Sequence, residues 1–124
     1  MTRAYAEVIG DPISHSKSPL IHNFWLAKLG IDAEYRACHV RPEELADYFA
    51  ARRPDPDWRG CNVTIPHKEQ VLADLDDIEP RARKIGAVNT IWRDHGSLLG
   101  CNTDVEGVAE AVQNLDIAGC AVVV

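Results

Sequence analysis

Short apolar runs and longer runs of helical spacing follow one another along this chain. The first short run, residues 4–10, ends in a Gly-Asp-Pro sequence and predicts a strand followed by a turn. Ser18 and Pro19 then favour a helix start, with a capping hydroxyl followed by proline at the first helical position. Gly30 stands where this helix would end. The apolar face of the helix is expected to comprise Leu20, Ile21, Phe24, Trp25 and Leu29.

The middle of the chain continues this exchange of strands and helices. Residues 33–40 alternate as in a strand, and residues 42–49 have the spacing of a helix that opens on proline. A third strand is predicted over 60–65, and the proline that follows ends it by removing a hydrogen-bond donor from the ladder. Two short helices would come next, one starting near His67 and one over 80–85.

The last third of the chain predicts a hairpin, a helix and a final strand. Residues 87–93 and 98–101 would pair around a polar turn. Thr103 and Glu106 have the spacing of a capping box and would open an amphipathic helix. Residues 119–124 have the composition of a strand. The whole order indicates an α/β domain with a mostly parallel, partly mixed sheet flanked by helices.

Composition and charge narrow the classes of protein to which the chain can belong. At 124 residues, 46% of them hydrophobic and 26% charged, it suffices for one domain, or for one domain plus the beginning of a second. A net charge of −6 without any cluster of Lys and Arg argues against a nucleic-acid surface. No apolar run approaches the ~20 residues that cross a bilayer, and the N-terminus lacks a signal-peptide pattern. A cytoplasmic location is therefore expected.

Cysteine and histidine residues give no sign of a disulfide framework or a metal site. The four cysteines are widely spaced and are expected to be buried, reduced thiols. The five histidines show no metal-ligand spacing and are expected to be structural or solvated.

Polar groups suited to chemistry collect in expected loops and element ends. Ser14 and Ser16 lie two residues apart, so their hydroxyls would point to the same side of an extended loop and could hold a carboxylate. Taken alone, a serine-rich turn before a helix explains them at least as well. Thr64 and Asn89 sit among apolar neighbours and must find partners, either backbone groups or the hydroxyls of a ligand.

One lysine and one aspartate supply opposite charges in the same segments. Lys68 follows a buried-looking strand, where an ammonium group could give and recover a proton; a solvated lysine on a first helical turn is the alternative. Asp104 lies just inside the start of an expected helix, where the helix dipole alone would stabilise a carboxylate.

Four segments of this chain combine these polar groups in a fixed order and spacing: Ser14-x-Ser16-x-Ser18-Pro19, Asn62-Val63-Thr64-x-Pro66-x-Lys68, Gly86-Ala87-Val88-Asn89-Thr90 and Gly100-x-Asn102-Thr103-Asp104. Together they resemble the shikimate dehydrogenase family. The resemblance extends from Tyr5 to Val124. It implies a substrate-binding domain of the family's N-terminal type over 1–103. Residues 104–124 would then be the crossover helix and first strand of a truncated dinucleotide-binding domain.

The resemblance also implies an activity, the NADPH-dependent reduction of 3-dehydroshikimate to shikimate in aromatic amino acid biosynthesis. The substrate-binding residues would be Ser14, Ser16, Thr64, Lys68, Asn89 and Asp104. The two serines would hold the substrate carboxylate. Lys68 and Asp104 would be the catalytic pair, with Lys68 donating a proton to the oxygen that hydride transfer leaves negative.

The cofactor and partners follow from the same resemblance. NADP(H) would be bound by the family's C-terminal part, so no cofactor-binding residue is expected here, and this chain alone is expected to be inactive. Its partner would be shikimate or 3-dehydroshikimate, and a homodimer is compatible with the family. A quinate/shikimate dehydrogenase would share fold and catalytic pair. A non-catalytic shikimate-binding regulatory module would need no proton-transfer pair, so the presence of Lys68 and Asp104 favours the enzyme.

Overall fold

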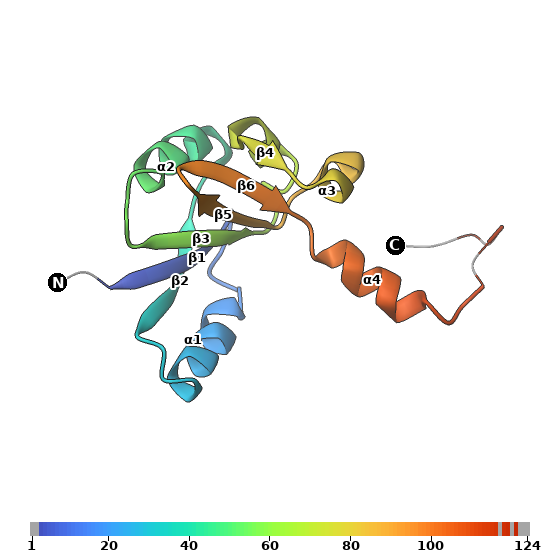
Figure 1. Ribbon diagram of the computed structural model, residues 1–124, viewed down its shortest axis with the longest axis horizontal. Coiled ribbons are helices and arrows are strands. Elements are labelled where there is room, and N and C mark those ends of the chain that lie inside the picture. Colours follow the sequence, from blue (N-terminus) through green and yellow to red (C-terminus); the bar gives the residue numbers. More distant parts are fainter. Residues whose placement is uncertain (1–2, 117, 120, 122–124) are drawn as a thin grey trace.

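One six-stranded sheet organises the chain, with strands in the order β2-β1-β3-β5-β6-β4 (Figure 1). The computed structural model describes residues 3–116, 118–119 and 121. The strands are β1 (Ala4–Gly10), β2 (Ala33–His39), β3 (Trp58–Val63), β4 (Asp77–Ile78), β5 (Thr90–Asp94) and β6 (Ser97–Cys101). The helices are α1 (Ser18–Lys28), α2 (Leu45–Arg52), α3 (Pro80–Ile85) and α4 (Asp104–Val112), with 3₁₀ helices η1 (Pro42–Glu44) and η2 (Gln70–Asp74).

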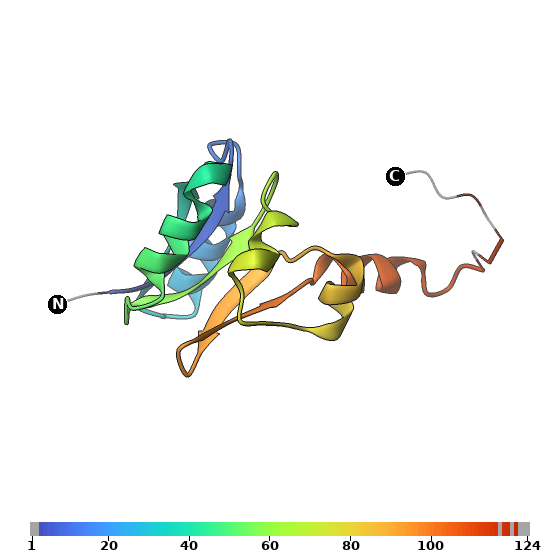
Figure 2. The ribbon, with the colours of Figure 1, turned by 90° about the horizontal axis from the view of Figure 1, so that it is seen from above.

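The sheet is mixed, as the sequence predicted. β1 pairs in parallel with β2 and β3, and β4 pairs in parallel with β6. β5 is antiparallel to both of its neighbours, β3 and β6. Helix α4 leaves the end of β6 and runs out from the body of the sheet (Figure 2).

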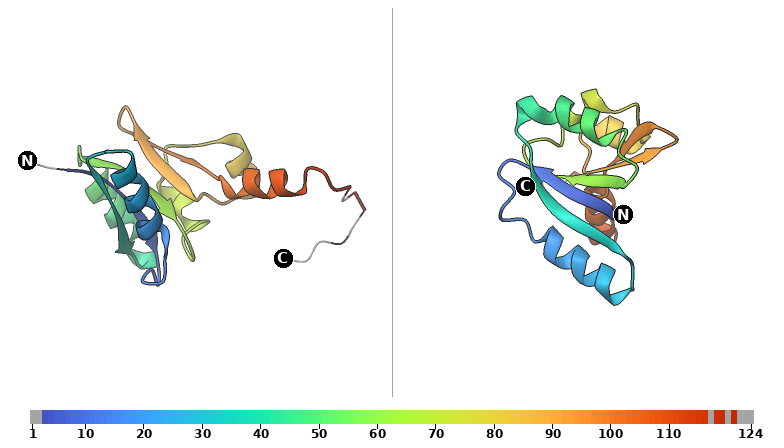
Figure 3. Two further views of the ribbon diagram at one scale, coloured as in Figure 1. Left: turned by 90° about the horizontal axis from the view of Figure 1, so that it is seen from below. Right: turned by 90° about the vertical axis from the view of Figure 1, so that its left-hand side faces the viewer.

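Helices cover the two faces of the sheet unequally (Figure 3). The α2 face carries the larger core, because Ile9, Trp58 and Ile91 project toward α2 and η2 and are 1% exposed or less. The α1 face carries a smaller core of Val8, Ile13 and Tyr35, against which Leu26 packs. Side chains that alternate along β1 thus serve both layers.

Helix α1 forms where it was expected, but its apolar side chains are not buried. None of its residues is buried, and Leu20 and Phe24 are 74% and 61% exposed. Apolar spacing predicts a helix, and here it did not predict burial. Between α1 and the strands lies a groove of about 450 Å³. Its lining includes Trp25, Leu26, Leu29, Tyr35, Asn62 and Trp92.

Several local expectations were wrong at this level. Helix α1 begins with Lys17, not Ser18, at the N-cap position. The helix expected near His67 is the 3₁₀ helix η2, and the strand β4 that follows went unpredicted because two residues are too few to show a period. The expected strand at 119–124 falls mainly outside the described residues.

The thiols are less uniformly buried than expected. Cys61 is buried, whereas Cys38 and Cys101 are partly exposed, and all three are unpaired. Burial raises the pKa of each thiol, so they stay protonated near neutral pH.

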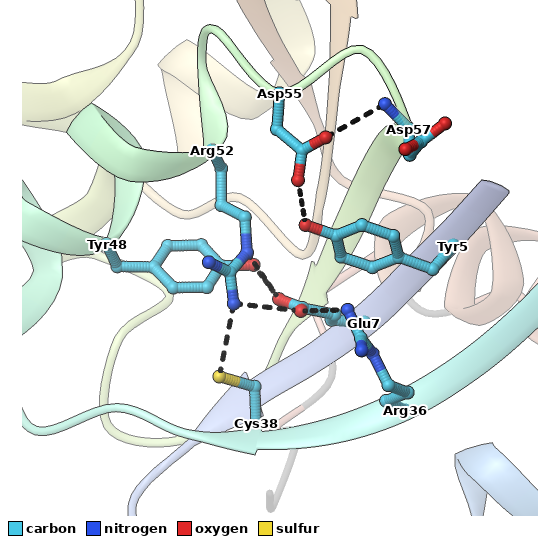
Figure 4. A network of polar contacts seen from close by, with 8 residues as sticks. All are labelled: Tyr5, Glu7, Arg36, Cys38, Tyr48, Arg52, Asp55 and Asp57. Carbon is cyan, nitrogen blue, oxygen red and sulfur yellow. Dashed lines mark hydrogen bonds and ion pairs between the residues drawn. The ribbon is translucent and has the colours of Figure 1, made fainter. Parts of the chain in front are cut away.

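A buried carboxylate ties strands β1 and β2 to helix α2 (Figure 4). Glu7 is 1% exposed and accepts hydrogen bonds from the Tyr48 hydroxyl and from Nε and Nη2 of Arg52, at 3.2 and 3.0 Å from the arginine nitrogens. Arg36 Nη2 lies 3.5 Å from the same carboxylate. A buried charge is tolerated only when it is paired and hydrogen-bonded, and Glu7 meets that condition.

The network continues to the loop before β3 through Tyr5. The Tyr5 hydroxyl donates to Asp55 at 2.5 Å, and the Arg36 guanidinium lies 3.9 Å from the centre of the Tyr5 ring. Burial, aided by the bond to Asp55, raises the pKa of Tyr5 to about 12, so the phenol remains a donor.

Replacing Arg52 by Met should destabilise the fold by about 3 kcal/mol, because it leaves Glu7 buried with fewer donors. Urea unfolding followed by circular dichroism measures this loss. The control is Arg83→Met: Arg83 pairs with Asp77 at 3.5 Å on the surface, so its loss should cost under about 1 kcal/mol. Equal stability losses in the two variants would contradict the role given to Glu7.

Candidate functional site

Strand direction brings the four polar segments to one edge of the sheet. β1, β3 and β6 run the same way, since β5 is antiparallel to both β3 and β6. Their carboxyl ends and the beginning of β5 therefore meet at a single edge (Figure 1). The segments at that edge are 11–17, 64–69, 86–89 and 102–104.

The first segment connects β1 to α1 and presents two hydroxyls. Ser14 is exposed, and Ser16 is partly buried. Ser16 Oγ accepts the N–H of Ser18 at 3.2 Å, so this hydroxyl satisfies one of the free N–H groups at the start of α1. The Ser18 hydroxyl, expected to cap α1, makes no cap hydrogen bond, and the Ser18 N–H is bonded by the hydroxyl of Ser16 instead.

The second segment is packed tightly against the first. The Thr64 N–H donates to Ile9 O at 3.0 Å, and the Asp11 N–H donates to Ile65 O at 3.1 Å. A Cβ at Gly10 would lie 2.6 Å from Cγ2 of Thr64, closer than real Cβ contacts allow. Glycine is therefore required at position 10 by the approach of Thr64.

Substituting Gly10 by Ala should displace the turn at 64–68. We expect changed backbone amide signals for these residues in a ¹H–¹⁵N spectrum and a stability loss of about 1–3 kcal/mol from overpacking. Gly107→Ala is the matched control, because no atom lies within 4 Å of a Cβ placed there. Unchanged signals over 64–68 in Gly10→Ala would show that the contact is not restrictive.

His67 fixes the turn immediately before Lys68. It is fully buried, and its Nε2 lies 2.5 Å from the carbonyl oxygen of Val40. A carbonyl only accepts, so Nε2 carries the proton. The Val88 N–H also donates to Lys68 O at 2.8 Å, so both the side chain before Lys68 and its own backbone are held.

Lys68 and Asp104 meet at this edge, 36 residues apart in sequence. Lys68 Nζ lies 2.8 Å from Oδ2 of Asp104, and the two side chains are 34% and 57% exposed. A pair this exposed contributes little to stability, about 0–1 kcal/mol. The fold does not need the pair, and its solvent exposure leaves both groups able to contact a ligand.

Two buried asparagines fix the backbone beside Asp104. Asn102 accepts the Asp104 N–H at Oδ1, 2.9 Å away, and donates from Nδ2 to Ala87 O at 3.1 Å. Asn89 accepts the Thr103 N–H at Oδ1, 3.0 Å away, and donates from Nδ2 to Thr103 Oγ1 at 2.9 Å. The Thr103 hydroxyl is thereby engaged by Asn89, and Thr103 makes no side-chain cap to α4.

The structure thus corrects and extends the residue assignments. The expected capping box at Thr103 does not form, since a partner 14 residues away binds its hydroxyl. Asn102 received no role from the sequence, although it lies within a quoted motif. Its signal was a short amide next to an expected helix start, a common position for side chains that bond to backbone. The second N–H of Asn89 Nδ2 has no partner among the described residues.

Other kinds of site receive no support from this edge. Across residues 3–116, 118–119 and 121, no group of three or more His, Cys, Asp or Glu is placed to hold a metal ion. None of the helices in the described part of the chain has the length and apolar character needed to span a membrane. The sequence has no G-x-G-x-x-G phosphate-binding pattern.

The chain is similar to known proteins both in sequence and in structure. A family model described as the shikimate dehydrogenase substrate binding domain matches residues 8–91. The NADP(+) shikimate dehydrogenase of Sphingopyxis alaskensis is 53% identical over 97% of this chain and 44% of its own length. The chain thus spans less than half of the curated relatives it matches.

Solved structures agree in fold. The shikimate 5-dehydrogenase of Thermus thermophilus, in complex with shikimate, matches with a TM-score of 0.82 and 40% identity over 90% of this chain and 42% of that one. A 5-ketofructose reductase of Gluconobacter sp. matches with a TM-score of 0.83 and 31% identity, over 94% of this chain and 42% of its own.

Proposed function

Because the chain belongs to the shikimate dehydrogenase family, we propose that it is the substrate-binding part of an enzyme that reduces 3-dehydroshikimate to shikimate with NADPH. The observation that carries this proposal is the solvent-open Lys68–Asp104 pair, 2.8 Å apart and not needed for the fold. A site that only binds hydroxyls has no use for an ammonium and a carboxylate in contact.

The proton chemistry follows from the charge that develops on the ketone. The bound NADPH would supply a hydride to the carbonyl carbon, which would leave the carbonyl oxygen of the substrate negative. Lys68 stabilises this oxygen and gives it a proton, so that ketone, hydride and proton yield the alcohol. In the reverse direction the neutral amine of Lys68 takes the proton back. Asp104 holds the ammonium in place and accepts a hydrogen bond from a substrate hydroxyl.

The remaining polar groups at the edge suit a small carboxylated ring. Ser14 and Ser16 supply hydroxyl donors for the carboxylate, on the segment that crosses next to the turn at Thr64. Thr64 and Asn89 face ring hydroxyls. The Thr64 hydroxyl has no hydrogen-bond partner among the described residues, and Asn89 retains an unused N–H there. The serine pair favours a carboxylated substrate over a neutral sugar ketone.

NADP(H) needs residues beyond those that form this edge. The curated relatives are named as NADP(+) enzymes, and no described residue forms a glycine-rich phosphate loop. We propose that the cofactor is held by polypeptide outside these 124 residues, so that this chain alone binds substrate without turning it over.

Titration of the 124-residue chain with shikimate, followed by ¹H–¹⁵N NMR, tests the substrate site. Saturable chemical-shift changes should centre on the proposed substrate-binding residues Ser14, Ser16, Thr64, Asn89 and Asp104. A parallel titration with quinate distinguishes the two carboxylated substrates. A folded chain that shows no shifts, even when extended through a nucleotide-binding part, would contradict the proposal.

Kinetics of Lys68→Ala test the catalytic pair in a fusion that adds the remaining part of the Sphingopyxis alaskensis enzyme. We expect kcat to fall by about 10²–10⁴-fold, with a much smaller change in KM, because Lys68 acts as the general acid. Asp104→Asn should affect both quantities. Lys84→Ala removes an exposed lysine of α3 and should leave both unchanged. A Lys68→Ala enzyme with near-normal kcat would exclude the proton-donor role.

A further inference from the structure

A row of hydrogen bonds crosses the α1 face of the sheet and ends at the candidate site. The Tyr35 hydroxyl donates to Oδ1 of Asn62 at 2.7 Å, and Asn62 Nδ2 donates to Oγ1 of Thr90 at 3.2 Å. The Thr90 hydroxyl donates to Oδ1 of Asn89 at 2.9 Å, and Asn89 Nδ2 donates to Thr103. Every bond in the row points from β2 toward the site.

Strand register places the members of the row side by side. Asn62 of β3 lies directly opposite Thr90 of β5, in the antiparallel pair at the centre of the sheet. Tyr35 reaches them from the edge strand β2, where its ring stacks on His22 at 4.2 Å between ring centres. Both backbone polar groups of Tyr35 bond to the Asn23 side chain at 2.8 and 2.9 Å. The far end of the row is thus held by α1.

The direction of the row has one consistent assignment. The Thr103 backbone N–H can only donate, so Asn89 must present its oxygen there and toward Thr90. Thr90 therefore donates to Asn89 and accepts from the amide nitrogen of Asn62. The oxygen of Asn62 is left to accept from Tyr35, whose hydroxyl keeps its proton because burial raises its pKa.

We propose that Thr90 and Tyr35 are positioning residues for this site, and that they hold the Asn89 amide with its free N–H toward the ligand and its oxygen on the Asp104 turn. The identity of the ligand in this inference rests on the proposed function, whereas the row of hydrogen bonds does not depend on it. A strand of this kind would accept valine at position 90 at least as well as threonine. The hydrogen bonds that the Thr90 hydroxyl makes to the side-chain amides of Asn62 and Asn89 account for a threonine at this position.

Three variants test the row in the 124-residue chain. Thr90→Val removes the hydroxyl and keeps the β-branched shape, Thr90→Ser keeps the hydroxyl, and Tyr35→Phe removes only the first donor. Tyr5→Phe is the matched control, because it removes a tyrosine hydroxyl bond, to Asp55, on the α2 side of the sheet. The readouts are the Asn89 side-chain NH₂ signals and the Thr103 and Asp104 backbone amides without ligand, followed by the shikimate Kd.

Thr90→Val should shift the Asn89 side-chain signals and weaken shikimate binding by about fivefold to tenfold, the effect of about one hydrogen bond. Thr90→Ser should restore both to near the wild-type values. Tyr35→Phe should shift the same signals in the same direction with a smaller loss, about twofold to threefold. Tyr5→Phe should leave the Asn89 signals in place.

Unchanged Asn89 and Thr103 signals in Thr90→Val, or failure of serine to restore them, would overturn the inference. If Thr90→Val does not fold, Tyr35→Phe against Tyr5→Phe decides the same question. A wild-type chain that binds no shikimate, even when extended through a nucleotide-binding part, would contradict the proposed function. The ligand-free signals of Asn89 would then still decide whether the row positions this amide.

Discussion

Pairing of β5 between β3 and β6 is the constraint on which the candidate functional site depends. By running against both neighbours, β5 lets the ends of β1, β3 and β6 share an edge with its own beginning. This pairing gathers serine hydroxyls, an ammonium, an amide and a carboxylate without long loops. They come from segments up to 90 residues apart, Ser14 to Asp104. A slip of β5 by one residue in this pairing would turn Thr90 to the face of the sheet opposite Asn62.

The two faces of the sheet use buried polar groups for different ends. On the α2 face, the Glu7 network joins β1, β2 and α2, and it lies among the larger core. On the α1 face, the row from Tyr35 to Asn89 leads from a helix with no buried residue to the site. The first network stabilises the body of the domain, and we propose that the second positions the Asn89 amide at the candidate site. Both are satisfied by hydrogen bonds, as burial requires.

Much of the fold, and the segments that meet at the candidate site, could be predicted from the sequence for identifiable reasons. A short apolar run located β1 and a period-two run located β2, while glycines at 30 and 86 marked the ends of α1 and α3. Lys68 and Asp104 were paired in advance because the motifs resemble a known family. Contacts between distant residues could not be read: the hydroxyl of Thr103 is bound by Asn89, and local spacing suggested a cap instead.

The hydrogen bonds that Asn89 and Asn102 make to the turn at 102–104 affect how helix α4 can move. Helix α4 buries none of its residues, so its first residue is held more firmly than the rest of the helix. That first residue is Asp104. If α4 tilts about its held N-terminus, its C-terminal end moves farthest and its N-terminus moves least. The carboxylate that faces Lys68 is therefore placed where a swing of the helix disturbs it least.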